Sequence, residues 1–424
     1  MTVRWVAVFG VVAFVLAACY PPVPPGDSYA VRWGTAMSGP TNEDEFDGIA
    51  AGAGGSAFVT GKFEQSVTLG GTTLTSAGRA DIPLARFDQF GRPLWVQRFG
   101  GTGEDNLFDI DADANGAVGT GWFAGTVDFG PVRLRAAGAS DCVVVAVDNA
   151  GAVRWARALG GPYRDGCNEV TIAADGSIVT SLDTEGGWTP PGHAAIPRLD
   201  FADTLLVHLS PGGDVQWMRR VGGPGPQRGK SLAVAPDGSI VFGGDTIGGL
   251  DVAGTAVTVP NMNRDAWISR WSAAGAQQWT KTWGGPGDDL AKGVVATADA
   301  VFVVGPFTGA TSFGGVTLDA GTNADLAVVR FSTSGTLAWA TSVRAPGPVD
   351  GAEAIAAADG GLLFGSTVTA GLQFGSAGGA YVPVDTSKGG TAWLAHYRPD
   401  GSLGFAATIA GTANGNIGEI ARGD

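Results

Sequence analysis

Acidic residues gather in glycine-rich loops, at positions that could bind a cation. Most of them stand a few residues after a glycine pair, and the set comprises Glu104, Asp105, Asp165, Asp288, Asp289 and Asp350. Carboxylate oxygens are the ligands that calcium prefers. If these loops share one face of the fold, that face carries a negative potential suited to a metal ion or a cationic partner. The alternative is a solvated acidic rim that binds nothing. Calcium is the one cofactor that we consider possible.

Residue patterns typical of catalytic or metal sites are missing from the sequence. Asp111, Asp113 and Asn115 match the first half of a calcium loop, but Trp122 occupies the position where that loop needs a bidentate acid. We therefore interpret this segment as a turn. No Ser/His/Asp set, phosphate-binding loop or zinc spacing stands out. Three histidines and three cysteines leave little material for a zinc site. We predict no catalytic residues and a protein that is not an enzyme.

Tryptophans recur at intervals of 60 to 62 residues along the chain: Trp95, Trp155, Trp217, Trp279 and Trp339. Each is preceded by a glycine four positions earlier and by an aspartate fourteen positions earlier: Asp81, Asp141, Asp203, Asp265 and Asp325. A sixth, degenerate copy follows with Phe405 in place of tryptophan. Fixed spacing of this kind marks a repeat architecture in which each copy is one structural unit.

Each repeat has the pattern of four short β-strands. Asp-Gly and Asn-Gly turns separate apolar runs, which is typical of hairpins. Evenly spaced antiparallel strands in such repeats favour an all-β fold, a β-propeller of four-stranded blades. The approximate blades are 46–100, 107–160, 168–222, 229–284, 291–344 and 351–410, within a propeller region 29–424. We favour six blades; in the seven-bladed alternative, the segments 29–37 and 417–421 are the last and first strands of a seventh.

The Asp…Gly-x-x-x-Trp…Gly-Gly pattern, seen in Asp81, Gly91, Trp95, Gly100 and Gly101, resembles the bacterial β-propeller repeat, called SBBP, of exported and surface proteins. The resemblance covers about residues 29 to 410. It implies the propeller fold and a setting outside the cytoplasm. It implies no catalytic residues.

A basic column lies on the third strand of the repeats, five residues after each aspartate: Arg86, Ala146, His208, Arg270, Arg330 and His396. It could grip an anion, or it could bond to the aspartate column of a neighbouring blade. Repetition in nearly every blade favours the structural interpretation, because one ligand site needs only one or two blades. The same reasoning favours packing between blades for the tryptophan column.

The N-terminus has the pattern of an export signal. An apolar run from Val6 to Leu16 is too short to span a bilayer as a helix. It ends in Leu-Ala-Ala-Cys19, which resembles the bacterial lipoprotein signal, so residues 1–18 would be removed and Cys19 lipidated. Residues 19–28 are proline-rich and favour an extended tether. We expect a lipid anchor in the bacterial envelope, on the periplasmic side of the outer membrane or on the cell surface.

Cys142 and Cys167 lie 25 residues apart in this exported chain. A disulfide between them is plausible in an oxidising compartment, and two buried thiols are the alternative.

These observations predict a non-catalytic, membrane-anchored binding or scaffolding module, with a protein or glycan partner and a monomeric state. Nucleic acid is an unsuitable partner because 40 acidic residues outnumber 26 basic ones, for a net charge of −14. An enzyme is the alternative: Asp88, Gly91 and Trp95 resemble the tryptophan-docking motif of pyrroloquinoline-quinone dehydrogenases, and a carbohydrate-active propeller is a further possibility. An outer-membrane assembly factor is an analogy of fold alone.

Overall fold

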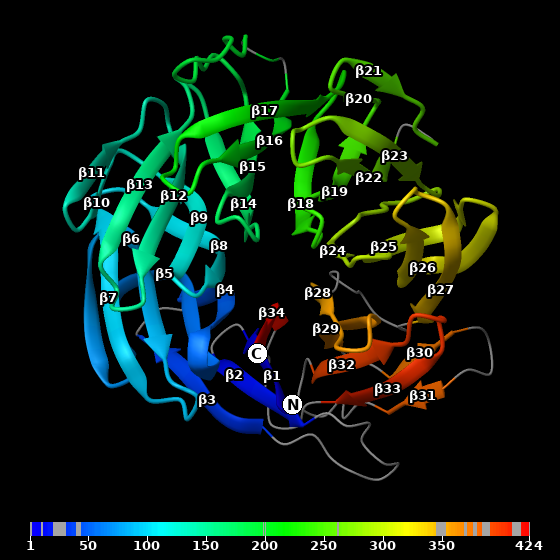
Figure 1. Ribbon diagram of the computed structural model, residues 1–424, viewed down its shortest axis with the longest axis horizontal. Coiled ribbons are helices and arrows are strands. Elements are labelled where there is room, and N and C mark those ends of the chain that lie inside the picture. The colour runs from blue at the N-terminus through cyan, green and yellow to red at the C-terminus, as the bar shows by residue number, and fades with distance from the viewer. Residues whose placement is uncertain are drawn as a thin grey trace. The chain divides into compact units, whose positions relative to one another are not determined.

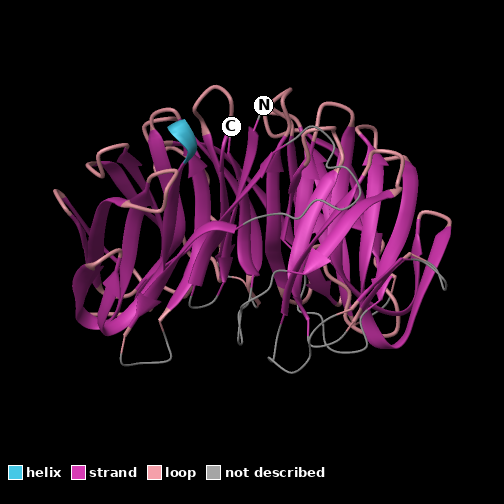
Figure 2. Ribbon diagram, turned by 90° about the horizontal axis from the view of Figure 1, so that it is seen from below, coloured by secondary structure: helices cyan, strands magenta, loops and turns pink. Residues whose placement is uncertain are grey.

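The structure is a computed structural model. It describes residues 2–9, 12–19, 31–39, 44–197, 199, 201–260, 263–344, 353–368, 371–375, 380–383, 391–408 and 417–423. The described residues form antiparallel strands and one 3-10 turn, Ala53–Gly55, with short loops between them (Figure 2). Among them, no helix is long and apolar enough to cross a membrane.

Six sets of four paired strands follow the repeat (Figure 1). The first three sets are β4 (Glu45–Gly52), β5 (Ser56–Leu69), β6 (Thr72–Phe87) and β7 (Pro93–Gly101); β8 (Asp105–Asp113), β9 (Gly116–Phe123), β12 (Asp141–Asp148) and β13 (Val153–Leu159); and β14 (Asp165–Ile172), β15 (Ile178–Thr184), β16 (Asp203–Leu209) and β17 (Val215–Gly222). The other three are β18 (Gln227–Val234), β19 (Ile240–Ile247), β22 (Arg264–Trp271) and β23 (Gln277–Trp283); β24 (Gly293–Ala296), β25 (Ala300–Phe313), β26 (Val316–Ser332) and β27 (Leu337–Arg344); and β28 (Glu353–Ala356), β29 (Leu362–Val368), β32 (Thr391–Tyr397) and β33 (Leu403–Thr408).

These sets belong to six antiparallel sheets, which confirms the predicted all-β propeller class. The first sheet also continues from β5 through β3 (Val31–Ser38), β2 (Val12–Cys19) and β1 (Thr2–Phe9) to β34 (Ile417–Gly423). The two segments that the sequence left over for a seventh blade, β3 and β34, are therefore the outer members of a further run of four strands.

The chain divides into two compact units. The first holds residues 1–199, 207–216 and 418–424, and the second holds 200–206 and 217–417. Inside the first unit, the leading strand β8 contacts β4 on one side and β14 on the other; inside the second, β24 contacts β18 and β28 in the same way. Small residues at these strands, such as Ala50 and Val294, allow this approach, and both are buried.

Hydrophobic cores lie between neighbouring sets of strands rather than within one set. In the first unit, Phe58 and Ile82 of one set are clustered with Leu107 and Val143 of the next. In the second unit, a similar cluster spans from Phe302 to Trp393. Each sheet is therefore stabilised by burying its face against a neighbouring sheet.

In three of the sets, the variable segment between the second and third strands forms a hairpin that extends the sheet of the preceding set. They are β10 (Thr126–Phe129) with β11 (Val132–Arg135), β20 (Leu250–Val252) with β21 (Thr255–Val257), and β30 (Leu372–Phe374) with β31 (Ala380–Val382). Their first strands pair with β7, β17 and β27, respectively. The segments that differ most between repeats therefore lie at the outer edges of the sheets.

Candidate functional site

The acidic loops do not form an exposed cation site in the structure. Asp105, Asp165 and Asp289 are buried, with exposed fractions of 0%, 2% and 0%. Each carboxylate accepts a hydrogen bond from the second glycine of the preceding pair: the donors are Gly101, Gly161 and Gly285, at 2.8, 2.7 and 2.7 Å. The prediction of a negatively charged rim at these positions is therefore wrong, because the carboxylates turn inward to satisfy backbone donors of their own loops.

The remaining acidic residues of the predicted set do not come together either. Asp288 is exposed and lies 3.3 Å from Arg264, which offsets its charge. Glu104 is half-buried. Asp350 lies outside the described residues. Among the described residues, no group of three or more His, Cys, Asp or Glu side chains could hold a metal ion.

The aspartate column explains why the glycine pair is part of the repeat. Asp81 is fully buried, and its carboxylate lies against Gly100, where an added Cβ would meet the Asp81 carboxylate carbon at 2.3 Å. The same carboxylate forms an ion pair with Arg98. Asp203 repeats the arrangement with Gly222 and Arg220. The first glycine of the pair therefore leaves room for a buried carboxylate.

Burial also changes the protonation of the loop carboxyl groups. Desolvation raises the pKa of Asp105 and of Asp289 to about 7, because a buried carboxylate loses its hydration. The nearby carboxylates Asp81 and Asp265 act in the same direction. These groups are framework residues whose charge is suppressed near neutral pH.

Each repeat tryptophan docks on the turn of the next repeat. The indole Nε1 of Trp155 donates a hydrogen bond of 2.9 Å to the carbonyl oxygen of Pro211, and its ring lies against Gly213. The other four make the same contact with a carbonyl oxygen 54 to 60 residues further on: Trp95 with Asn149, Trp217 with Ala273, Trp279 with Thr333 and Trp339 with Pro399. The tryptophan column therefore joins consecutive repeats and is not a platform for ligands.

The basic column is also structural, although its partners differ from the predicted ones. Arg86 donates to the carbonyl oxygen of Asn149 at 2.7 Å, and Arg270 donates to that of Thr333 at 2.8 Å. Arg270 also pairs with Asp237, in a turn of its own repeat. The expected bond to the aspartate column of a neighbouring repeat is therefore wrong; the arginines bond to turns.

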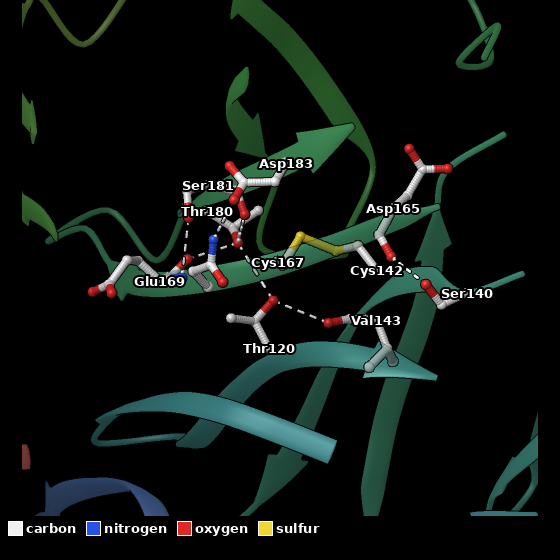
Figure 3. Close-up of a disulfide and its surroundings, with 11 residues drawn as sticks. Thr120, Ser140, Cys142, Val143, Asp165, Cys167, Glu169, Thr180, Ser181 and Asp183 are labelled. Carbon is white, nitrogen blue, oxygen red and sulfur yellow. Dashed lines mark hydrogen bonds between the residues drawn. A yellow bond between two sulfur atoms is a disulfide. The ribbon is translucent and has the colours of Figure 1, made fainter. Parts of the chain in front are cut away.

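Cys142 and Cys167 form a disulfide, drawn in Figure 3. It connects β12 with β14, the third strand of one repeat and the first strand of the next. Both cysteines are fully buried. Beside them, the Ser140 hydroxyl donates to the carbonyl oxygen of Asp165 at 3.1 Å, as Figure 3 shows. The disulfide adds a covalent bond at a junction that the tryptophan docking also stabilises.

The other residues that the sequence singles out also have structural positions. The half calcium loop is the hairpin turn between β8 and β9, and Asp111 accepts a hydrogen bond from the Ile172 backbone at 2.8 Å. In the segment between β15 and β16, Trp188 is buried, and His193 bonds to the carbonyl oxygen of Val215 at 3.0 Å. Cys19 is the last residue of β2.

A pocket of about 480 Å³ lies where the variable segments of two consecutive repeats meet, and we call it the hairpin pocket. Its lining residues come from β26, β27, β30 and β31 and the loops beside them: Asp319, Ala320, Gly321, Asn323, Asp325, Arg344, Gly371, Gln373 and Tyr381. All of them belong to the second unit. The volume lies in the range of small-molecule sites.

Strand register builds one wall of the hairpin pocket. Arg344 on β27 is paired with Gln373 on β30, and Gln373 is paired with Tyr381 on β31. Side chains of directly paired residues stand on the same face of a sheet, so these three form one cross-strand row. Arg344 Nε lies 3.8 Å from Asp325 Oδ2, and its Nη2 donates to the carbonyl oxygen of Asp319 at 3.0 Å. The guanidinium is thereby fixed on the wall.

A tyrosine stands at the edge of the hairpin pocket. Tyr381 is 67% exposed, whereas the repeat tryptophans are buried or half-buried. The hydroxyl of Tyr381 passes so close to Gly371 that an added Cβ there would lie 2.1 Å from the hydroxyl oxygen. Gly371 therefore sets the position of the ring.

The sequence offered little signal for this site. No other repeat carries residues equivalent to Arg344, Gln373 and Tyr381. The repeat pattern also does not specify the register between β27 and β30. The clue that exists is compositional, because tyrosine is rare in this chain, with five copies against thirteen tryptophans. The strongest patterns in the sequence are positions that recur, and these lie at the junctions between repeats.

No protein-family model matches the chain. A regulatory protein of Caulobacter vibrioides, FlaEY, is 25% identical over 209 residues; the match covers 48% of this chain and 21% of that protein. The chain thus spans about a fifth of the length of this relative.

Two solved structures are similar at low identity. A protein from Lactobacillus plantarum aligns over 100% of this chain and 99% of its own, at 10% identity and a TM-score of 0.49. A mutant of the Synechocystis protein ACO aligns over 99% of this chain and 72% of its own, at 9% identity and a TM-score of 0.38. The sheets and junctions described above define this chain as a β-propeller.

Proposed function

We propose that this protein is a non-catalytic binding or scaffolding module, lipid-anchored in a bacterial envelope, and that the hairpin pocket is its ligand site. One observation carries the proposal. The repeated polar residues are buried in junctions, whereas Arg344, Gln373 and Tyr381 of the hairpin pocket are unrepeated and line a cavity. In repeat folds, specificity commonly resides in the segments that vary between repeats.

The Caulobacter relative is described as a regulatory protein, which is compatible with a role in binding. The resemblance of the repeat to the SBBP pattern, and of the N-terminus to a lipoprotein signal, supports a place in the envelope. Cleavage before Cys19 would remove β1 and all but the last residue of β2. The mature propeller would then retain β3 and β34 of that run of strands.

The anchor and the binding role are tested separately. The full chain is expressed in a bacterial host with an alkyne-labelled fatty acid. The wild type is expected to carry the fatty-acid label and to be found in the membrane fraction. The C19S variant is expected to lose the label and the membrane association. The double variant C142S/C167S is the matched control and should keep the label. Label that persists in C19S would refute the anchor.

For binding, the detergent-solubilised protein is crosslinked in envelope extract. Recovery of a specific partner by the wild type, and its loss in Tyr381→Ala, is the expected result. An identical set of recovered molecules for wild type and variant would contradict the assignment of the hairpin pocket.

A further inference from the structure

We infer that the hairpin pocket takes a neutral, polyhydroxylated ligand, a saccharide. This inference rests on the proposed binding function and names the class of ligand. Three features of the pocket favour this class: the hydrogen-bonding groups of its wall, its fixed charges and its exposed tyrosine ring.

Two carboxamides in the hairpin pocket have no partner within the described part of the chain. Neither the side chain of Asn323 nor that of Gln373 forms a hydrogen bond to another described residue, and both line the cavity. A carboxamide offers donors and acceptors side by side. A hydroxyl group is also both donor and acceptor, so neighbouring hydroxyls of a sugar can satisfy both ends of such a group.

The fixed charges disfavour ionic ligands. Asp319 and Asp325 would repel an anion, and Arg344 would repel a cation. Arg344 is already held by Asp325 and by the Asp319 carbonyl oxygen, so its remaining N–H groups can serve as donors without reorientation. The Asp319 carboxylate uses Oδ1 to accept from the Gly321 backbone at 2.9 Å. Oδ2 remains as an acceptor. A neutral ligand with many hydroxyls suits this mixture.

Tyr381 supplies the apolar contact that a saccharide needs. Its ring is in the same cross-strand row as Gln373, so a ligand bonded to the carboxamide lies beside the ring. The C–H face of a pyranose is apolar and can pack on an aromatic ring whose polar end remains in water. A wholly apolar ligand would cover the two carboxamides and the remaining N–H groups of Arg344 without offering them hydrogen bonds, which costs free energy.

The experiment is saturation-transfer NMR, followed by calorimetry, on the full chain purified in detergent after expression. The probes are neutral disaccharides (maltose, lactose, cellobiose and chitobiose), with glucuronate and glucosamine as charged comparisons. At least one neutral disaccharide should bind more tightly than either charged sugar. Tyr381→Ala should weaken that binding about tenfold, and Gln373→Ala or Asn323→Ala about fivefold each.

Two further variants separate contact from folding. Gly371→Ala is expected to displace the Tyr381 ring and weaken binding although it removes no polar group. Phe90→Ala removes an aromatic ring of similar exposure, 63%, in the first unit, and should leave binding unchanged. Melting curves of all variants should match the wild type.

Absence of saturation transfer from every sugar at about 10 mM would overturn the inference. So would binding that Tyr381→Ala and Gln373→Ala leave unchanged, or tighter binding of a charged sugar. If the sugars fail but the envelope crosslinks still depend on Tyr381, the saccharide class is wrong and the binding function stands. If the crosslinks are also unaffected, both are wrong.

Discussion

The docking of Trp155 on Gly213 can be measured by a double-mutant cycle. Trp155 is 8% exposed and donates a hydrogen bond of 2.9 Å to Pro211. Removing a buried tryptophan side chain with its hydrogen bond costs about 4 kcal/mol of unfolding free energy. Gly213 has φ +83°, and a Cβ there would lie 2.7 Å from the Trp155 ring. Gly213→Ala should therefore cost about 1 kcal/mol for the left-handed backbone and about 2 kcal/mol more for displacing the ring.

In the Trp155→Ala background the ring is gone, so Gly213→Ala should cost only the backbone contribution. The double variant should then lose about 5 kcal/mol rather than the additive 7, which gives a coupling of about 2 kcal/mol. An unfolding entropy of about 2.1 cal/mol/K per residue, over 424 residues, corresponds to about 1.1 °C of melting temperature for each kcal/mol. The expected decreases are about 4.5, 3.5 and 5.5 °C for Trp155→Ala, Gly213→Ala and the double variant.

Differential scanning calorimetry measures these shifts. Gly125→Ala is the matched control, because Gly125 has φ +72° in the same unit but no atom within 4 Å of an added Cβ. It should cost about 1 kcal/mol and be additive with Trp155→Ala. If Gly213→Ala is as additive as Gly125→Ala, the docking of each tryptophan on the next turn does not stabilise the junction as argued.

Three further predictions concern the same junctions. Because burial raises the pKa of Asp105 and Asp289 to about 7, the folded chain keeps protons that the unfolded chain releases above about pH 4. The melting temperature should fall as pH rises from 4 to 7 and level off above, and Asp289→Asn should flatten that fall; a rise through this window would contradict the assignment. Cys142→Ser with Cys167→Ser should lower the unfolding free energy by about 3.5 kcal/mol, since the bond closes a loop of 25 residues, and dithiothreitol should give the wild type the same loss; equal melting with and without reductant would refute it. Gly100→Ala should lower the melting temperature by at least about 2 °C, because its Cβ would collide with the Asp81 carboxylate, and an unchanged melting curve would show that the carboxylate can move freely.

The propeller class can be predicted from the sequence because the same packing contacts between side chains and glycines are required at the junctions between repeats. Each tryptophan needs a glycine on the next turn, and each buried aspartate needs a glycine beside its carboxylate, as Trp155 with Gly213 and Asp81 with Gly100 demonstrate. Requirements that recur in space recur in the chain at a fixed interval. The same rule explains why these columns recur in the repeats.

The position of the hairpin pocket could not be predicted in the same way. The cross-strand row of Arg344, Gln373 and Tyr381 arises from pairing between β27 and β30, which lie in different repeats. No residue spacing encodes that register. The predicted exposure of the acidic loops was wrong for a related reason. An aspartate in a glycine-rich loop has the same sequence pattern whether its carboxylate points to water or accepts a hydrogen bond from a backbone N–H of its own loop, as that of Asp105 does.

A difference between the repeats shows that this buried loop position does not require a charge. At the position equivalent to Asp105, Asp165 and Asp289, the third junction carries Gln227, which is neutral at every pH and is fully buried. Its backbone N–H donates to the Ala202 carbonyl oxygen at 3.0 Å, just as that of Asp289 donates to Arg264 at 2.9 Å, so this backbone bond is preserved. At this junction Asp203 is already paired with Arg220. A site whose charge can be removed without changing the loop is poorly suited to hold a cation, and a raised pKa at its acidic counterparts has the same physical meaning: the fold stabilises the uncharged form.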